Sequence, residues 1–569
     1  MAKRINLVLA FFLLCFFLLI SKLFIWQVIR GKDLSESAKG QYQVGKVTEA
    51  PRGNILAADG SPLAVRHEAW LLFAEPPNLK ESSDKIAEKL APLLSLDPED
   101  KDEVFTKYQA LNILLSKKGS VWVPLAHKVS TEVKGNIEAL GYSGLGFEKE
   151  EDRYYPEASV AAQLLGFVGK NEEGGNVGYF GLEGYYDLTL AGKKGYSQGD
   201  KDAKGVPILL GNFKESPALM GVDLVTSINK TVQLSIEKRL KEGIERYGAA
   251  GGSVVVMDPK DGKILGMASY PSFDPRKYSQ YGDALFKNPV ISDTFEPGSI
   301  FKVLIMASAL DAKAVKPDTI CDACSGPLKV DKYEIETWDG KYYPDSTMTD
   351  VILHSDNVGM SYVGGKLGAD TMYDYLDKFG IGKETGIDLQ GEVSVPLRKK
   401  GSWNIVDLAT ASFGQGVAVT GIEMTRAVAA IANDGLMPTP FVISSLKGEN
   451  WQEEIKPKTQ RVISEKAANE MTAMMVNAAR NGESKWTSLR GFSVAGKTGT
   501  AQIPISGHYD PTSTNASFVG FSPAESPKFI MLVTLNKPQS SQWASETAAP
   551  LWCSIARDLF LYFGIQPEN

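Results

Sequence analysis

Glu296-Pro-Gly-Ser-Ile-Phe-Lys302 leads into the apolar run Val303 to Leu310, and this stretch decides the fold of the second half of the chain. Its composition predicts a buried helix with Ser299 at the first turn. Ser299 and Lys302 are three residues apart, so a helix places the hydroxyl and the amine on one face. A serine hydroxyl is a poor nucleophile until a base removes its proton, and burial near a helix N-terminus favours a neutral lysine that can do so. The stretch therefore predicts an activated serine.

The Ser-x-x-Lys pattern is weak by itself, because it also occurs at Ser82, Ser227 and Ser444. At Ser82 and Ser444 the pattern fits a serine at a helix start beside a solvated lysine. Lys302 differs, since Val-Leu-Ile-Met follows it and would draw its side chain into the core. The local context therefore favours a chemical role for Ser299.

A second polar string, Ser355-Asp-Asn357, lies between two apolar stretches. A loop of this kind can aim a hydroxyl and an amide into a cleft, where the hydroxyl passes a proton to a leaving amine and the amide holds part of the acyl donor. Loop capping explains the same string without any chemistry. The string therefore supports an acylation centre only in combination with the others.

A third string, Lys497-Thr-Gly-Thr500, ends a strand pattern that starts at Phe492. Gly499 lets a ligand approach the backbone closely, while the lysine offers a cation and the threonines offer hydroxyls to a substrate carboxylate. The backbone N–H groups of Ser299 and Thr500 can together form an oxyanion hole. A turn at the edge of a sheet is the alternative interpretation.

Together the three strings resemble the motif set of serine β-lactamases and penicillin-binding proteins. The chain is most similar to class B high-molecular-weight penicillin-binding proteins, which are monofunctional peptidoglycan D,D-transpeptidases. The resemblance is highly specific over residues 223–553 and moderate over residues 50–192. Ala57-Ala-Asp-Gly60 departs from it, because many members carry a charged residue before this turn. Further family-like strings are Arg52-Gly53, Gly181-Leu-Glu183, Met257-Asp-Pro259, Phe413-Gly-Gln-Gly416, Ile431-Ala-Asn-Asp-Gly435 and Phe518-Val-Gly-Phe521.

The resemblance implies a fold and a set of site residues. The fold is an α/β (α+β) transpeptidase domain of the β-lactamase-like type, an antiparallel sheet flanked by helices, with an N-terminal β-rich pedestal module and one transmembrane helix. Ser299 attacks the penultimate D-alanine carbonyl of a stem peptide, Lys302 takes the hydroxyl proton, and Ser355 passes a proton to the departing D-alanine. The implied substrate-binding residues are Asn357, Lys497, Thr498, Gly499 and Thr500.

The resemblance also implies partners, and it leaves alternative functions open. The implied partners are peptidoglycan stem peptides, β-lactams, the cell membrane, a glycan polymerase of the SEDS type and other division proteins. Ser355-Asp-Asn-Val-Gly-Met360 is closer to division-type than to elongation-type members, which favours septal cell-wall synthesis. A β-lactamase or D,D-carboxypeptidase would use the same centre with water as acceptor, and a non-catalytic penicillin-binding scaffold is a third possibility.

The N-terminus differs from the rest of the chain. Lys3 and Arg4 precede fourteen consecutive apolar residues, Leu7 to Ile20, and residues 23–29 largely continue the pattern. A helix over residues 7–29 would be about 34 Å long, enough to cross a hydrocarbon core of roughly 30 Å. No small-residue cleavage site follows, which favours an uncleaved signal anchor over a removed signal peptide.

These patterns divide the chain into four parts. We expect a cytoplasmic tail (1–6), a transmembrane signal anchor (7–29), a pedestal or dimerisation-type domain (30–220) and a transpeptidase domain (221–569). The boundary near 220 follows from the polar, Gly-, Lys- and Asp-rich composition of residues 193–222. The resemblance implies a single-pass protein of the cytoplasmic (inner) membrane with an extracytoplasmic or periplasmic catalytic domain.

Periodicity predicts several elements. Residues 82–140 alternate charged and apolar residues at helical spacing and indicate surface helices. Beyond the boundary we expect a helix over 231–246, a hairpin of strands 251–257 and 263–269, strands at 516–521 and 529–535, and a closing helix over 550–563 ended by Gly564.

Cysteine content and charge narrow the remaining possibilities. Cys321-Asp-Ala-Cys324 can close into a disulfide in an oxidising compartment, with two free thiols or half of a zinc site as alternatives. No second cysteine pair or close histidine pair completes a zinc site, and the acylation chemistry calls for no metal or organic cofactor. The net charge of -7 gives no reason to expect nucleic acid as a partner.

Overall fold

The structure is a computed structural model of the chain. It describes residues 2–34, 43–95, 97–117, 119–172, 174–200, 213–485, 489–505 and 508–567. The chain divides into two compact units. One contains residues 1–52 and 191–221, and the other contains residues 53–190 and 222–569.

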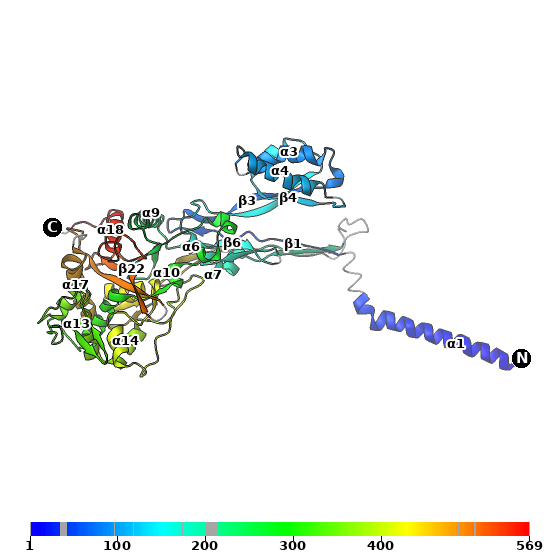
Figure 1. The fold of residues 1–569 in the computed structure, drawn as a ribbon. Helices are drawn as coiled ribbons and strands as arrows, with labels where there is room; N and C mark the ends of the chain where they lie inside the picture. Colours follow the sequence, from blue (N-terminus) through cyan, green and yellow to red (C-terminus); the bar gives the residue numbers. More distant parts are fainter. Residues whose placement is uncertain are drawn as a thin grey trace. The chain divides into compact units, whose positions relative to one another are not determined.

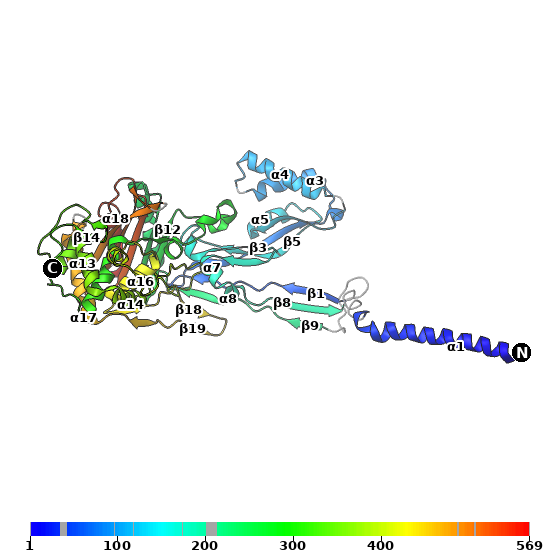
Figure 2. The ribbon, with the colours of Figure 1, turned by 60° about the horizontal axis from the view of Figure 1, so that its bottom comes forward.

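The first unit combines an apolar helix with a small antiparallel sheet, in which β1 pairs with β8 and β8 with β9 (Figure 2). Its elements are α1 (Ala2–Phe24), the π-helical turn η1 (Ile25–Ile29), β1 (Gln43–Thr48), β8 (Gly195–Asp200) and β9 (Phe213–Ser216). In the described part of the chain, the helical segment Lys3–Ile29 is long and apolar enough to cross a membrane. This finding fits the single-pass anchor predicted for residues 7–29.

The polar segment 193–222 contains two strands where its composition indicated a boundary region. Its first strand, β8, pairs with β1 from Gln43↔Asp200 to Thr48↔Gly195. Its second strand, β9, pairs with β8 in turn. Pairing with a strand about 150 residues away supplies the backbone hydrogen bonds here, and composition does not report such pairing.

The second unit begins with a seven-stranded sheet that combines early and late segments of the chain. The strand order is β19-β18-β10-β2-β3-β4, and β5 pairs with β3 along the edge opposite to β4. The strands are β2 (Ile55–Leu56), β3 (Pro62–Ala74), β4 (Val123–Val129), β5 (Leu145–Tyr154), β10 (Asp223–Thr226), β18 (Ile443–Lys447) and β19 (Gln452–Glu454). Strands from both sides of residue 220 therefore share one hydrogen-bonded sheet.

Three helices cover one end of this sheet, as Figure 2 shows for α3 and α4 over β3 and β5. They are α3 (Ser83–Leu94), α4 (Lys101–Leu115) and α5 (Thr131–Glu138). Their apolar residues, such as Ile86 and Leu111, pack with Leu72 of β3 in a separate core. The helical prediction for residues 82–140 is therefore correct for these helices. It is wrong for Val123–Val129, which forms β4 because β3 offers it a pairing edge.

A buried ion pair joins distant parts of this region. Arg153 at the end of β5 contacts Glu183 of α7 (Gly181–Tyr185) at 2.6 Å, and their side chains are 5% and 0% exposed. Arg153 also donates to the backbone carbonyl of Gly53 at 2.6 Å. The loss of one partner from such a pair is strongly destabilising, because the other charge then stays buried without a partner.

Several short elements also belong to this region. They are the 3₁₀ turn η2 (Pro76–Asn78), α6 (Ala162–Leu165), β6 (Phe167–Lys170), β7 (Asn176–Tyr179) and α8 (Asp187–Ala191). Here Phe167 stacks on Tyr179 and on Tyr278, which belongs to a 3₁₀ segment beyond residue 270. Aromatic packing thus links the β6–β7 hairpin to the C-terminal part of the second unit.

The C-terminal part of the second unit is built on a five-stranded antiparallel sheet with the order β12-β11-β23-β22-β21. Its strands are β11 (Gly251–Met257), β12 (Ile264–Tyr270), β21 (Ala495–Ile505), β22 (His508–Ser522) and β23 (Phe529–Asn536). The predicted hairpin of β11 and β12 and the predicted strands β22 and β23 are present. Strand β22 extends well before residue 516, because it pairs along nearly all of β21.

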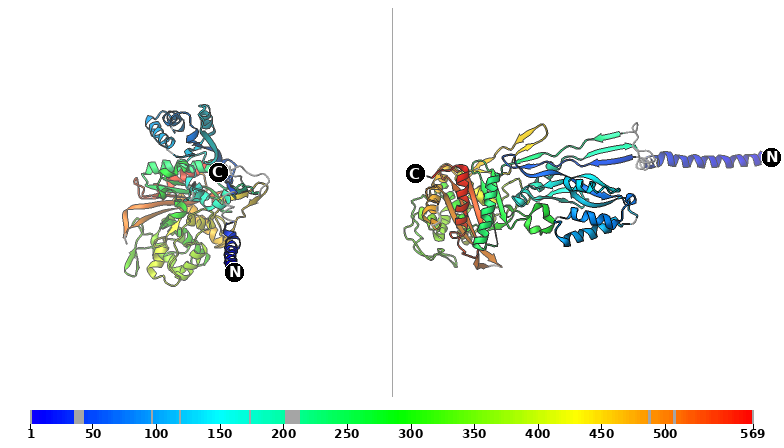
Figure 3. Two further views of the ribbon diagram at one scale, coloured as in Figure 1. Left: turned by 90° about the vertical axis from the view of Figure 1, so that its right-hand side faces the viewer. Right: turned by 90° about the horizontal axis from the view of Figure 1, so that it is seen from above.

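Both faces of this sheet are buried, which explains why β11 and β23 are apolar at nearly every position. Val254 of β11 and Val533 of β23 point into one core with helices α9 (Lys230–Tyr247) and α18 (Ala548–Phe563). The alternate residue Val255 points into the main helical core on the other face. Helices α9 and α18 lie side by side on their face of the sheet (Figures 1 and 3).

The opposite face of the sheet carries a helical subdomain that contains Ser299, Lys302 and Ser355. Its helices are α10 (Pro289–Ser292), α11 (Lys302–Asp311), α12 (Met348–Leu353), α13 (Asn357–Leu367), α14 (Ala369–Lys378), α15 (Ile405–Ala411), α16 (Gly421–Ala432) and α17 (Glu465–Asn481), with 3₁₀ turns η3 (Pro275–Gln280), η4 (Asp283–Leu285) and η5 (Gly298–Ile300). Short strand pairs join them: β13 (Thr294–Phe295) with β16 (Val419–Thr420), β14 (Leu328–Val330) with β15 (Tyr333–Ile335), and β17 (Leu436–Pro438) with β20 (Thr459–Arg461). Cys321 and Cys324 form a disulfide before β14.

Candidate active site

Ser299 lies in a short 3₁₀ turn, η5, that runs directly into the buried helix α11. The α-helix itself begins at Lys302, one turn later than the sequence pattern predicts. Residues Lys302 to Leu310 are all buried, so α11 is a core helix without a polar face. The backbone N–H of Gly298, which has φ of +54°, donates to the carbonyl of Gly414 at 3.0 Å. This contact fixes the turn that presents Ser299.

Lys302 is fully buried and makes three hydrogen bonds to the second string. Its Nζ donates to the backbone carbonyl of Ser355 at 2.6 Å, to Oδ1 of Asn357 at 2.7 Å and to Oγ of Ser355 at 3.3 Å. Burial, followed by the charge of Lys497, lowers the pKa of Lys302 to about 7. A lysine with this pKa is partly neutral at neutral pH and can accept a proton.

Ser355 lies between α12 and α13 in a strained backbone conformation. Its φ of +54° is in the left-handed region, which costs a residue with a side chain on the order of 1–3 kcal/mol. The neighbouring Asp356 caps α13 by accepting the backbone N–H groups of Val358 and Gly359. The cap fixes the backbone at Ser355, and the ammonium groups of Lys302 and Lys497 hold its hydroxyl in the site.

Lys497 approaches the same hydroxyl from strand β21. Its Nζ donates to Oγ of Ser355 at 2.9 Å and to Oγ1 of Thr498 at 3.1 Å. Burial lowers the pKa of Lys497, and the charge of Glu483 opposes this effect. Segments around residues 302, 355 and 497, far apart in sequence, thus meet through one connected set of hydrogen bonds.

Gly499 allows β21 to lie against the turn that carries Ser299. A Cβ atom at this position would be 2.9 Å from Cγ2 of Ile300 and 3.0 Å from the carbonyl oxygen of Pro297. It would also be 2.6 Å from Oγ of Ser517 on β22. Glycine is therefore required for the close approach of the two segments. Thr500 lies next along β21, and its Oγ1 accepts the backbone N–H of Ala544 at 3.0 Å.

Gly499→Ala is expected to slow acylation by a fluorescent penicillin at least about tenfold, because β21 must shift away from the Ser299 turn. The labelling rate of the purified protein measures this effect. Gly365→Ala on α13 is the matched control, since nothing lies within 4 Å of its added Cβ. Equal labelling rates for Gly499→Ala and the control would contradict the packing argument.

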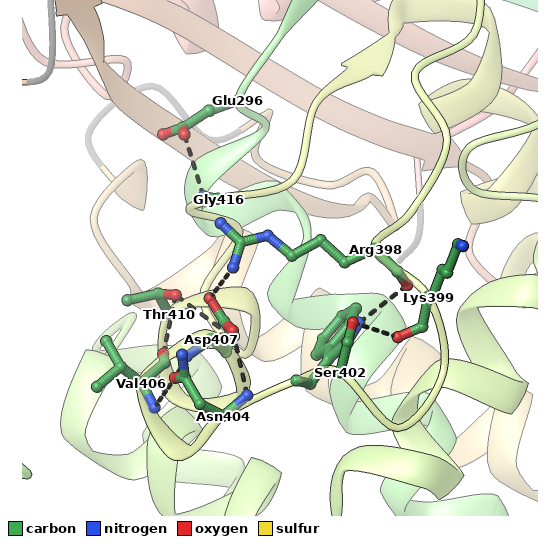
Figure 4. Close-up of polar contacts among 10 residues, drawn as sticks. Glu296, Arg398, Lys399, Ser402, Asn404, Val406, Asp407, Thr410 and Gly416 are labelled. Carbon is green, nitrogen blue, oxygen red and sulfur yellow. Dashed lines mark hydrogen bonds and ion pairs between the residues drawn. The ribbon is translucent and has the colours of Figure 1, made fainter.

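A second polar cluster surrounds Glu296, which stands three residues before Ser299 in the chain. Its carboxylate accepts the backbone N–H of Gly416 at 3.0 Å (Figure 4). It also accepts the hydroxyl of Tyr509 at 3.1 Å, and burial raises the pKa of this carboxyl group. Near Gly416, Nη1 of Arg398 forms an ion pair with Oδ1 of Asp407 at 2.5 Å (Figure 4). A cavity of about 220 Å³ lies between these segments, and its lining includes Gly416 and Arg398.

Sequence reasoning missed two acidic residues of the site. Glu296 stands directly before Pro-Gly-Ser299, but its partners Gly416 and Tyr509 are more than 100 residues away. Glu483 stands in the polar run Asn481-Gly-Glu-Ser-Lys485, which resembles an ordinary loop after a helix. The structure brings its Oε2 to 2.7 Å from Oγ1 of Thr498.

Comparisons with known proteins agree with this architecture. Residues 252–560 match the family described as the penicillin binding protein transpeptidase domain, and residues 47–226 match the penicillin-binding protein dimerisation domain. The stage V sporulation protein D of Bacillus subtilis is 32% identical over 100% of this chain and 87% of that protein. Peptidoglycan D,D-transpeptidase FtsI of Buchnera aphidicola is 28% identical over 100% of this chain and 96% of that protein.

A solved structure extends the likeness to three dimensions. The crystal structure of penicillin binding protein 2X from Streptococcus thermophilus matches with a TM-score of 0.75 and 24% identity, covering 92% of this chain and 80% of that one. The chain belongs to the penicillin-binding protein transpeptidase family. Because a dimerisation domain precedes the transpeptidase domain, it is a class B member, and the assignment made from the sequence is confirmed.

Proposed function

We propose that this protein is a membrane-anchored peptidoglycan D,D-transpeptidase that works through a serine acyl-enzyme on Ser299. The observation that carries the proposal is the hydrogen-bonded set of Lys302, Ser355 and Lys497, in which two buried lysines share one hydroxyl. A site of this kind can move a proton between a nucleophile and a leaving group without any cofactor.

In the acylation step, Oγ of Ser299 forms a bond to the penultimate D-alanine carbonyl carbon of the donor stem peptide. Lys302 takes the Ser299 proton, because its lowered pKa leaves a neutral fraction near pH 7. The bond to the terminal D-alanine then breaks, and its amine receives a proton through the Ser355 hydroxyl. An amine of a neighbouring stem peptide resolves the acyl-enzyme by the reverse sequence and forms the cross-link.

The remaining site residues hold the donor. The backbone N–H groups of Ser299 and Thr500 stabilise the oxyanion of the tetrahedral intermediate. Lys497, Thr498 and Thr500 hold the donor's carboxylate, with Gly499 allowing its close approach, and Asn357 holds its amide. Asn357 also keeps Lys302 in place, because its Oδ1 accepts a hydrogen bond from Nζ of Lys302 at 2.7 Å. β-Lactams acylate Ser299 because they mimic the donor.

We place the protein in septal cell-wall synthesis. This role is supported by Ser355-Asp-Asn-Val-Gly-Met360 and by relatives whose names include peptidoglycan D,D-transpeptidase FtsI. An anchor in the cytoplasmic membrane, an extracytoplasmic catalytic domain and a partner polymerase of the SEDS type belong to this proposal.

The test of the proposal is mass spectrometry of the intact protein after treatment with penicillin. We expect one adduct per chain, and digestion maps it to the peptide that carries Ser299. An adduct on any other residue contradicts the proposal. Steady turnover of nitrocefin, instead of one burst per protein, favours a β-lactamase or carboxypeptidase. Cross-linking that persists in Lys302→Ala but is lost when residues 40–200 are deleted favours a scaffold.

A further inference from the structure

The carboxylate of Glu483 reaches β21, the strand that carries Lys497-Thr-Gly-Thr500. Glu483 lies in the turn after α17, and its Oε2 accepts the hydroxyl of Thr498 at 2.7 Å. The same hydroxyl accepts the ammonium of Lys497 at 3.1 Å. A hydroxyl has one proton to donate, so the Thr498 proton is already engaged by Glu483.

Charge connects Glu483 to both buried lysines. Its negative charge opposes the desolvation of Lys497 and also acts on Lys302. Asp356 is the other carboxylate that acts on Lys302, but it caps α13 through backbone N–H groups. Glu483 therefore places a carboxylate beside the Thr498 hydroxyl and the Lys497 ammonium, two groups that can together bind an anion.

We propose that Glu483 is a specificity-determining residue that occupies the position of the donor's carboxylate. This inference rests on the proposed function, in which Thr498 and Lys497 hold that carboxylate. A carboxylate that accepts the Thr498 hydroxyl beside the Lys497 ammonium has the chemistry expected of the terminal carboxylate of a D-alanyl donor. A donor must displace Glu483 before it can form these hydrogen bonds. The site therefore binds anionic donors less tightly than the same site without this charge.

The donor's carboxylate must replace the carboxylate of Glu483, so the weakening of binding by Glu483 is specific to anionic ligands. An anionic donor loses binding both to competition for the Thr498 proton and to repulsion by a like charge. A neutral donor experiences the competition only weakly, because it does not need this pair of partners. The ratio of the two affinities isolates the contribution of Glu483 from any general change in the site.

Glu483→Gln tests this inference with benzylpenicillin and its methyl ester, which lacks the carboxylate. Acylation is followed over a range of concentrations to separate the dissociation constant from the acylation rate constant. We expect the dissociation constant for benzylpenicillin to fall about tenfold, and that for the ester to change less than about twofold. Any effect of Glu483 on the base Lys302 appears in the acylation rate constant and is common to both ligands.

Glu470→Gln on α17 is the matched control, because it removes one negative charge from the same helical region without touching Thr498. It is expected to leave both dissociation constants unchanged. If Glu483→Gln does not fold, Glu483→Asp, which withdraws the carboxylate by one methylene, is expected to shift the benzylpenicillin constant in the same direction. Equal changes for acid and ester, or weaker binding of the acid, overturn the inference. Absence of acylation in the wild-type protein instead contradicts the proposed function.

Discussion

Ser299→Ala is expected to abolish covalent labelling by a fluorescent penicillin, with a loss of at least about 10⁴-fold in the labelling rate. The reason is chemical, since methyl cannot form an ester with the β-lactam carbonyl. Ser299 is half-buried on the turn η5, so the change leaves no large cavity and the protein is expected to keep its thermal unfolding midpoint. Labelling is measured on a gel after denaturation, which retains only covalent adducts.

Ser444→Ala is the matched control for this experiment, because Ser444 also heads a Ser-x-x-Lys pattern. The helix start expected there is wrong, since Ser444 lies in β18, which pairs with β10. This variant is expected to label like the wild-type protein. Undiminished labelling of Ser299→Ala would mean that another residue is the nucleophile. The serine mechanism would then have to be assigned elsewhere in the chain.

Lys302→Arg is expected to lower the acylation rate constant by about 10²–10⁴-fold, because a guanidinium stays protonated and cannot accept the serine proton. In the proposed mechanism the neutral amine of Lys302 is the base. Since the pKa of Lys302 is about 7, the acylation rate is expected to rise as the pH increases through 7 and to level off above it. Below pH 7 the amine is protonated and the rate falls. Stopped-flow acylation between pH 5.5 and 8.5 measures this profile.

Lys302→Met provides the second variant, since it removes the base with a neutral side chain that suits a buried position. Its rate is expected to be low at every pH in the range. Lys366→Arg, on the exposed side of α13, serves as the control and keeps both the wild-type rate and the pH profile. A flat wild-type profile from pH 6 to 8, or rapid acylation of Lys302→Met, would rule out Lys302 as the base.

Local patterns predicted the elements whose character is set by their own residues. Lys302 precedes a continuous apolar run, and only burial of the whole helix explains that run, so the fold of α11 and the position of its lysine were readable. The same holds for β11 and β23, which are apolar on both faces because helices cover both. The order of the three strings supplied the family, and the comparisons confirm it.

Long-range contacts were not readable from the sequence. Strands β4 and β8 carry weak patterns, and each depends on a partner strand that is distant in the chain. Lys497 was expected to face a substrate carboxylate, and the structure shows that its ammonium also donates to Ser355. Glu483 lies in an ordinary polar loop, and only its spatial position beside Thr498 gives it chemical interest.

The shared sheet of the second unit has a practical consequence for anyone who wants the catalytic half alone. Strand β10 is paired on one side with β18 and on the other, in parallel, with β2 through Leu224↔Ile55 and Val225↔Leu56. A recombinant fragment that starts at residue 221 would lose β2 and leave one edge of β10 open to water. Leu224, which is now fully enclosed, would be uncovered at that edge. Such a fragment is expected to self-associate through the open edge, whereas one that retains residues 53–190 stays monodisperse.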